Sequence, residues 1–61
     1  MANQAYHTER PKPEDYAPYH TMPAFQRGIV EQRNPFDPNS VEAQAWDRGA
    51  EYRMRMKRLG Q

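Results

Sequence analysis

Arginine side chains in the C-terminal half of the chain have the type and spacing that could bind phosphate. Together with two arginines of the predicted first helix they form one set of candidate RNA contacts: Arg27, Arg33, Arg48, Arg55 and Arg58. Guanidinium groups bind phosphate oxygens, and tyrosines stack on exposed bases; both contacts are used in RNA recognition. Asp47 and Glu51 lie among these arginines and weaken the positive field. The pattern predicts an RNA-binding helix face, with a solvated charged face as the alternative.

The charge of the chain is unevenly distributed, although its net value is only +1. Residues 1–46 hold four basic and six acidic side chains, whereas residues 47–61 hold five basic and two acidic ones. This asymmetry indicates an anionic partner for the C-terminal end, with a solvated helix end rich in Lys and Arg as the alternative.

Catalytic and metal-binding residues are sparse. The two histidines, His7 and His20, both lie in the N-terminal third, and the chain has no cysteine. No glycine-rich loop precedes a helix, and no spacing matches a metal site. We therefore predict a binding protein and not an enzyme, with no metal and no cofactor.

A second set of candidates consists of aromatic and apolar side chains for contact with a protein partner: Tyr16, Tyr19, Phe36, Trp46 and Met54. The central member is Trp46, which lies roughly 110° around its helix from the main apolar stripe. One neighbouring helix cannot cover both surfaces. We consider three candidates that would cover the surface around Trp46: Phe36 with the N-terminal tail, a second copy of the chain in a homodimer, or a target protein.

The fold that positions these residues must be small. The chain has 61 residues, of which 36% are hydrophobic and six are prolines, so one small core is the upper limit. Its mean hydropathy is -1.28. No apolar run approaches the roughly 20 residues of a membrane span, and the first ten residues lack a signal-peptide pattern. We therefore expect a cytoplasmic protein with no membrane partner.

The predicted fold class is all-α, a short helical hairpin of residues 21–61 behind an irregular N-terminal tail of residues 1–20. The tail has three prolines, scattered charges and no periodicity, so we expect it to be irregular or disordered. The first helix is predicted over residues 21–33, with Thr21 as its N-cap and Pro23 in its first turn.

A proline-rich loop of residues 34–40 joins this helix to a second one, predicted over residues 41–59. Asn39 or Ser40 can cap the second helix, and Gly60 ends it. One face of this helix carries an apolar stripe: Val41, Ala45, Gly49, Tyr52, Met56 and Leu59. The stripe requires a partner helix, which the first helix can supply.

A short motif occurs in both helices. Phe25-Gln26-Arg27-Gly28 and Trp46-Asp47-Arg48-Gly49 share the pattern aromatic-x-Arg-Gly. A glycine inside a helix costs roughly 1 kcal/mol relative to alanine and so implies a packing reason. We expect a tight hairpin in which each aromatic ring packs over the bare backbone of the other helix. Coincidence between short strings is the alternative.

These motifs resemble those of the ribosome modulation factor family and of related small phage and plasmid proteins linked to ciprofloxacin resistance. Family members have an Arg-Gly in helix one, a Cys- or Asn-Pro-aromatic loop, and a Trp-x-x-Gly in helix two. The matching residues are Arg27-Gly28, Asn34-Pro35-Phe36 and Ala45-Trp46-Asp47-Arg48-Gly49, within about residues 24–50. The chain departs from the family at Ala50, where an aromatic is usual, and in its longer, less basic N-terminus.

The resemblance implies a two-helix protein that binds the small ribosomal subunit near the messenger exit region and promotes inactive ribosome dimers. We therefore expect a small, non-catalytic ribosome-associated modulator whose partner is the small subunit or its RNA. The alternative is a phage-type accessory protein that binds and inhibits one host protein through its tail and Trp46 surface.

Overall fold

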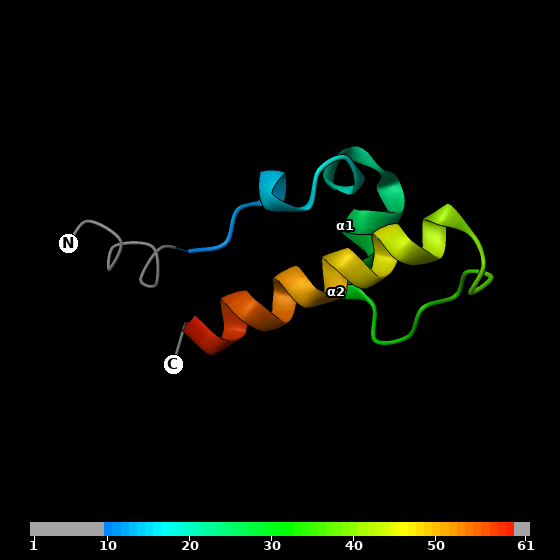
Figure 1. The fold of residues 1–61 in the computed structure, drawn as a ribbon. Helices are drawn as coiled ribbons and strands as arrows, with labels where there is room; N and C mark the ends of the chain where they lie inside the picture. Colours follow the sequence, from blue (N-terminus) through cyan, green and yellow to red (C-terminus); the bar gives the residue numbers. More distant parts are fainter. Residues whose placement is uncertain (1–9, 60–61) are drawn as a thin grey trace.

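The computed structural model describes residues 10–59, whose regular elements are all helical. In chain order they are two short 3-10 helices, η2 (Pro13–Tyr16) and η3 (Tyr19–Thr21), and two α-helices, α1 (Pro23–Val30) and α2 (Val41–Leu59). Helix α1 crosses behind α2, and the connecting loop returns to the start of α2 (Figure 1). The predicted two-helix fold with a proline-containing loop and an irregular N-terminal region is therefore confirmed.

Two further sequence predictions concern membrane-spanning helices and the first residues of the N-terminal tail. No helix within residues 10–59 is both long enough and apolar enough to cross a membrane. The first part of the predicted tail, residues 1–9 with His7, lies outside the residues that the structure describes.

Helix α1 is shorter at both ends than the predicted helix over residues 21–33. It begins at Pro23, because the residue before a proline is pushed into the extended region, and Met22 has φ -86° and ψ 141°. Thr21 is therefore not the N-cap; its hydroxyl donates to the Pro18 carbonyl at 3.1 Å. At the other end Glu31 is extended, with φ -93° and ψ 154°, so the helix stops at Val30.

Helix α2 has the predicted bounds. The Ser40 hydroxyl accepts a hydrogen bond from the backbone N–H of Ala43 at 3.1 Å, which confirms Ser40 as the N-cap. The same hydroxyl donates to the Asp37 carbonyl at 2.6 Å, and Asp37 Oδ1 accepts from the Asn39 N–H at 2.9 Å. The loop is thus held by its own side chains, and it leads directly into the first turn of α2.

The two helices touch at their glycines. A Cβ atom on Gly28 would collide with the carbonyl oxygen of Trp46, and one on Gly49 would collide with the carbonyl oxygen of Phe25. The same atom on Gly49 would lie 3.2 Å from the Cα of Gly28. The predicted tight hairpin is therefore present, but the expected contact is wrong in one respect. The backbones of the two aromatic residues, and not their rings, lie against the glycines.

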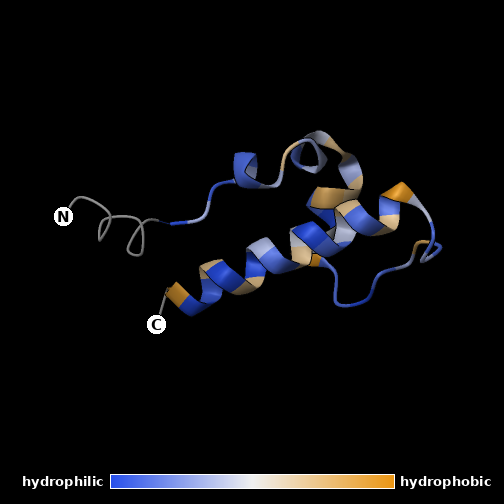
Figure 2. Ribbon diagram, viewed as in Figure 1, coloured by the Kyte–Doolittle hydropathy of each residue, from blue (hydrophilic) through white to orange (hydrophobic). Residues whose placement is uncertain are grey.

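The core is thin and lies where α1 meets the first half of α2. Phe25 and Ala45 are fully buried, and Ala24 and Ala43 nearly so. Helix α1 supplies much of this apolar surface, whereas α2 is largely hydrophilic between its two ends (Figure 2). Small alanines on both sides of the contact are consistent with the close approach of the two backbones.

Residues 10–20 pack against the hairpin although their backbone is irregular. Tyr16 is 7% exposed, and its ring centroid lies 5.8 Å from that of Phe25 and 6.1 Å from that of Tyr52. The Tyr19 hydroxyl donates to Gln44 Oε1 at 2.8 Å. A domain boundary at residue 20 therefore leaves out Tyr16, which belongs to the core. A single aromatic carried by a 3-10 turn needs no helical period to reach a core, so periodicity could not detect it.

Candidate nucleic-acid interface

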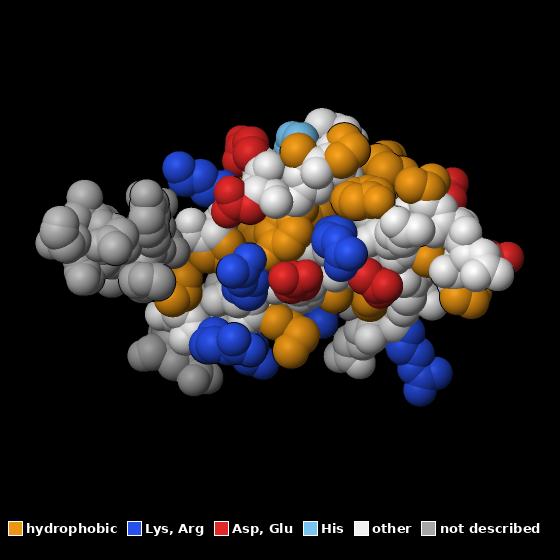
Figure 3. Space-filling view, viewed as in Figure 1, with side chains coloured by type: hydrophobic (Ala, Val, Ile, Leu, Met, Phe, Trp, Pro, Cys, Tyr) orange, Lys and Arg blue, Asp and Glu red, His pale blue; other side chains and the backbone are white. Residues whose placement is uncertain are grey.

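One end of the molecule is strongly basic. We define the basic end as residues 10–12 and 52–59, which hold six basic and no acidic side chains: Arg10, Lys12, Arg53, Arg55, Lys57 and Arg58. The rest of the described chain, residues 13–51, holds three basic and seven acidic side chains. Figure 3 shows basic side chains gathered toward the C-terminal end of α2, and acidic ones over its middle and over η2. The fold therefore concentrates positive charge at one end, with Glu14 and Asp15 at its border.

Two segments far apart in sequence form the basic end. Helix α1 has only eight residues and contacts α2 around Gly49, so the last turns of α2 extend beyond it (Figure 1). The segment that precedes η2 runs beside these turns, and together they line an open groove that includes Pro11, Tyr52 and Met56. The last turns of α2 thus present Arg55 and Arg58 on one side and Arg53 and Lys57 on the other, and the N-terminal segment adds two more cations.

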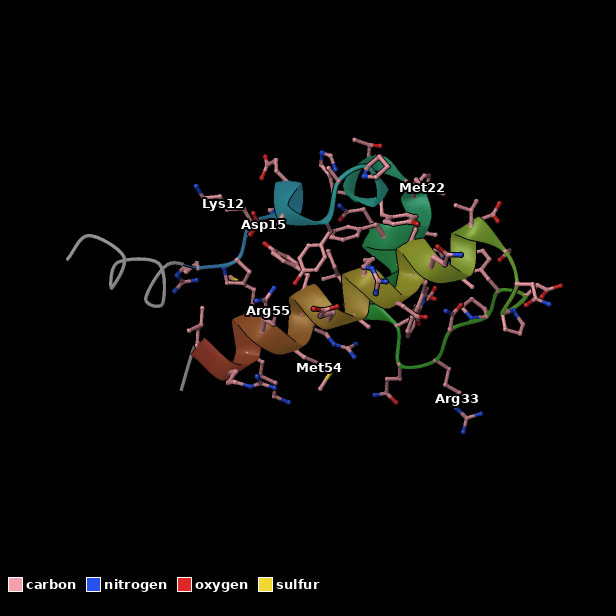
Figure 4. The ribbon with its side chains drawn as sticks, viewed as in Figure 1. Lys12, Asp15, Met22, Arg33, Met54 and Arg55 are labelled. Atoms are coloured by element: carbon pink, nitrogen blue, oxygen red, sulfur yellow. The ribbon has the colours of Figure 1, made fainter. Side chains whose placement is uncertain are left out.

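A hydrogen bond between Arg55 and Tyr16 holds the two segments together. Arg55 Nη1 donates to the Tyr16 hydroxyl at 2.9 Å, and the Tyr16 ring is buried beneath it. In Figure 4, Arg55 points from α2 toward the segment that contains Lys12 and Asp15. The hydrogen bond to Tyr16 is the largest cause of a raised pKa at Arg55. Arg55 therefore remains charged and is held at the middle of the basic end.

Arg27 has a structural partner and lies outside the basic end. Its Nε is 2.7 Å from Glu31 Oε2, and its guanidinium lies 5.0 Å from the centroid of the Phe36 ring. The other carboxylate oxygen of Glu31 accepts from Trp46 Nε1 at 2.9 Å. The hydrogen bond from Trp46, followed by the one from Arg27, lowers the pKa of Glu31. Arg27 is therefore engaged with its own chain, and its contribution to an RNA surface is reduced.

The remaining predicted arginines occupy different surroundings. Arg33 is exposed in the loop and points away from both helices (Figure 4). Arg48 is partly exposed, with its Nη1 3.8 Å from Glu51 Oε1. Arg58 is exposed in the last turn of α2. The structure therefore brings Arg55 and Arg58 into one surface and leaves the other three predicted arginines outside it.

Arg10 and Lys12 belong to the basic end but are absent from the predicted set of RNA contacts. Both are exposed, and both line the groove beside α2. Their placement depends on Tyr16, whose burial anchors the preceding segment to the hairpin. The Arg10-Pro11-Lys12-Pro13 run was a visible signal of a basic, extended segment, but nothing in it indicated which surface it would meet.

Arg53 contributes to the hairpin as well as to the charge of the basic end. Its Nη1 donates to the backbone carbonyl of Glu31 at 2.9 Å. This hydrogen bond holds the chain where it leaves α1, next to the Glu31 carboxylate that binds Trp46. Arg53 is therefore mainly a structural residue. The other cations of the basic end remain available for contact with a ligand.

The candidate contacts for a protein partner are mostly covered within the chain. Tyr16 lies in the core, Tyr19 binds Gln44, and Phe36 lies beneath Arg27. Trp46 is 5% exposed and donates to Glu31, so its cover comes from its own chain. Only Met54, which is 54% exposed, presents more than half of its surface to solvent among these five residues.

Within residues 10–59, no group of three or more His, Cys, Asp or Glu side chains is placed to hold a metal ion. Comparisons with protein-family models, with curated proteins and with solved structures found no significant match.

Proposed function

We propose that the protein is a small, non-catalytic factor that binds RNA through its basic end and acts on the small ribosomal subunit. The observation that carries the proposal is the presence of six basic and no acidic side chains in residues 10–12 and 52–59. Clustered positive charge favours a polyanion even though the Glu14 and Asp15 carboxylates border it, and phosphate contacts supply most of the affinity in such complexes. The ribosomal target follows from the sequence resemblance to the ribosome modulation factor family.

The distribution of charge also favours one orientation on RNA. The acidic side chains of residues 13–51 would be repelled by phosphates, while the basic end would be attracted to them. A factor of this kind acts by occupying a site and needs no catalytic group. A cytoplasmic location belongs to the same proposal, because ribosomes are its expected target.

Inhibition of one host protein through the tail and Trp46 has less support. Trp46 is 5% exposed, so it cannot anchor an interface without rearrangement of its own surroundings. Among residues 10–59, the exposed large apolar residues are Val30, Val41, Met54 and Leu59. Two of them, Val41 and Leu59, lie at opposite ends of α2, and scattered apolar residues of this kind are normal on a soluble surface.

A pair of charge-matched variants tests the proposal. The double variant Lys57→Gln/Arg58→Gln removes two exposed cations from the basic end, and Arg33→Gln/Arg48→Gln removes two cations from outside it. Glutamine has nearly the same helix propensity as lysine and arginine, so both variants should keep the fold. Cosedimentation with purified small ribosomal subunits, and fluorescence anisotropy with a labelled RNA at several salt concentrations, measure the binding.

We expect the first variant to bind RNA more weakly than the wild type and the second to bind almost as well. The slope of log affinity against log salt should fall in magnitude by about 0.7 for each phosphate of a single-stranded RNA that the variant no longer neutralises. Equal reductions of affinity in the two variants would show that the basic end is not the binding surface. Absence of any binding to small subunits by the folded wild type would refute the ribosomal part of the proposal.

A further inference from the structure

An open groove of about 520 Å³ lies within the basic end, between the segment that precedes η2 and the last turns of α2. Its walls are the apolar side chains of Pro11, Pro13, Tyr52 and Met56, all of them half-buried. Arg10 and Lys12 lie at its exposed rim. Its size falls within the range of sites that hold small organic ligands, roughly 300–1,000 Å³.

We infer that this groove binds one unpaired nucleobase of a single-stranded RNA, while Arg10 and Lys12 contact the phosphates on either side of that base. The inference rests on the proposed RNA binding and identifies the form of RNA that the basic end recognises. A nucleotide combines a flat apolar surface with a charged backbone, and the groove offers the matching pair of apolar walls and a cationic rim.

The shape of the groove favours a base that belongs to a strand. The groove is open along its side, so the backbone of a polynucleotide can enter and leave it without threading through the protein. Bases within a duplex are stacked on both faces and cannot enter without being extruded, which costs the stacking and pairing of each base. Bases in loops and single-stranded ends carry no such cost. The groove therefore discriminates between single strands and duplexes.

The placement of the charges sets the direction in which the strand can leave the groove. Glu14 lies at the η2 end of the lining, where Asp15 accepts a hydrogen bond from the Lys12 N–H, whereas Arg10 lies at the other end of the same segment. Arg55, which is fixed by Tyr16, lies across from them on α2. Phosphates should therefore follow the side with Arg10 and Arg55 and avoid Glu14.

A lipid surface fits this site less well. Membrane-binding helices present projecting apolar side chains, but the apolar walls here are recessed, and Met56 is half-buried while Met54 on another face is 54% exposed. The groove itself lies between two separate segments, with the rim cations Arg10 and Lys12 on one and the apolar side chains of Tyr52 and Met56 on the other. These features favour a ligand that inserts a flat group between the segments.

The test compares two labelled probes that have the same number of phosphates: a ten-nucleotide single-stranded RNA and an abasic sugar-phosphate strand of equal length. Binding to the full chain is followed by fluorescence anisotropy. The groove variant is Met56→Gln, and the matched control is Met54→Gln, the same substitution two residues away on the same helix. A second groove variant, Pro11→Ala, lies outside both α-helices and so tests the wall without changing α2. Circular dichroism verifies the helicity of each variant.

We expect the wild type to bind the RNA at least five-fold more tightly than the abasic strand, which is the lower end of the contribution of one stacked base. This preference should shrink toward one-fold in Met56→Gln and Pro11→Ala and persist in Met54→Gln. If the wild type binds both probes equally, the groove proposal is overturned while RNA binding through the basic end stands. If it binds neither probe, both proposals are overturned. Preferential binding to vesicles of anionic phospholipid over both strands would also overturn the base-binding role.

Discussion

Replacing Gly28 by alanine tests how closely α1 and α2 are held together. A Cβ atom at this position would collide with the carbonyl oxygen of Trp46, and it would lie 2.9 Å from the Trp46 carbonyl carbon and 3.0 Å from the backbone nitrogen of Ala50. All three are backbone atoms of α2. No side-chain rotation can relieve the collision, so the helices must move apart or α1 must shift along its axis.

Two effects of opposite sign determine the free energy of unfolding of this variant. Alanine is favoured over glycine inside a helix by about 0.8–1.0 kcal/mol, so helix propensity alone predicts stabilisation. Overpacking a close contact costs about 1–3 kcal/mol and occasionally more, and backbone collisions belong at the upper end because nothing flexible can yield. We therefore expect a net destabilisation of about 1–2 kcal/mol. A chain of this size has a total stability on the order of 3–9 kcal/mol, so a change of this magnitude should be easily measured.

Urea unfolding followed by far-ultraviolet circular dichroism gives the free energy of unfolding for the wild type, Gly28→Ala and a control, Gln26→Ala. Gln26 is exposed on the same helix, so its replacement tests propensity without the collision and should change stability by no more than about 0.5 kcal/mol. The contact between the two helix backbones would be refuted if Gly28→Ala stabilised the protein by about 1 kcal/mol, as propensity alone predicts.

Two further predictions concern the elements that hold the hairpin. The pKa of Glu31 is lowered in the fold, so its contribution to stability is present above the ordinary value of 4.5 and is lost as the pH falls through the lower folded value. Acid unfolding followed by Trp46 fluorescence should therefore depend less on pH in Glu31→Gln, and an unchanged pH profile would argue against the carboxylate hydrogen bonds. Ser40→Ala removes the oxygen that accepts from Ala43 N–H and should cost about 0.5–2 kcal/mol in urea unfolding. An unchanged midpoint would mean that water or a loop residue replaces the cap.

Helix α2 was predictable because its local signals agree with one another. A capping serine precedes it, a long amphipathic pattern follows, and cations occupy its last turn, where they complement the helix dipole. Helix α1 had conflicting signals, because Thr21 resembles an N-cap while Pro23 forces Met22 into an extended conformation. The restriction that Pro23 places on Met22 determines where α1 begins, because the Thr21 hydroxyl can bond another acceptor, here the Pro18 carbonyl, whereas the proline ring is fixed.

The candidate site was only partly predictable because tertiary contacts assemble it. Arg10 and Lys12 reach α2 through the burial of Tyr16, and no periodic pattern indicates which surface an isolated tyrosine will cover. The ion pair between Arg27 and Glu31 could be predicted more easily from the sequence, because the two residues are four positions apart and such pairs commonly interact. The second partner of that carboxylate, Trp46, is fifteen residues away from it and depends on the crossing of the helices.

The most direct test of the central claim is a titration of the isotopically labelled full chain with a single-stranded RNA, followed residue by residue through the NMR shifts of the backbone amides. The proposed RNA-binding surface predicts the largest shift changes within residues 10–12 and 52–59, with small changes at Arg33 and Arg48, which lie outside it. Because proline has no amide, the N-terminal side of the groove is reported by Arg10 and Lys12. Changes centred on the loop of residues 34–40 or on the first turns of α2, with the basic end unaffected, would contradict the claim.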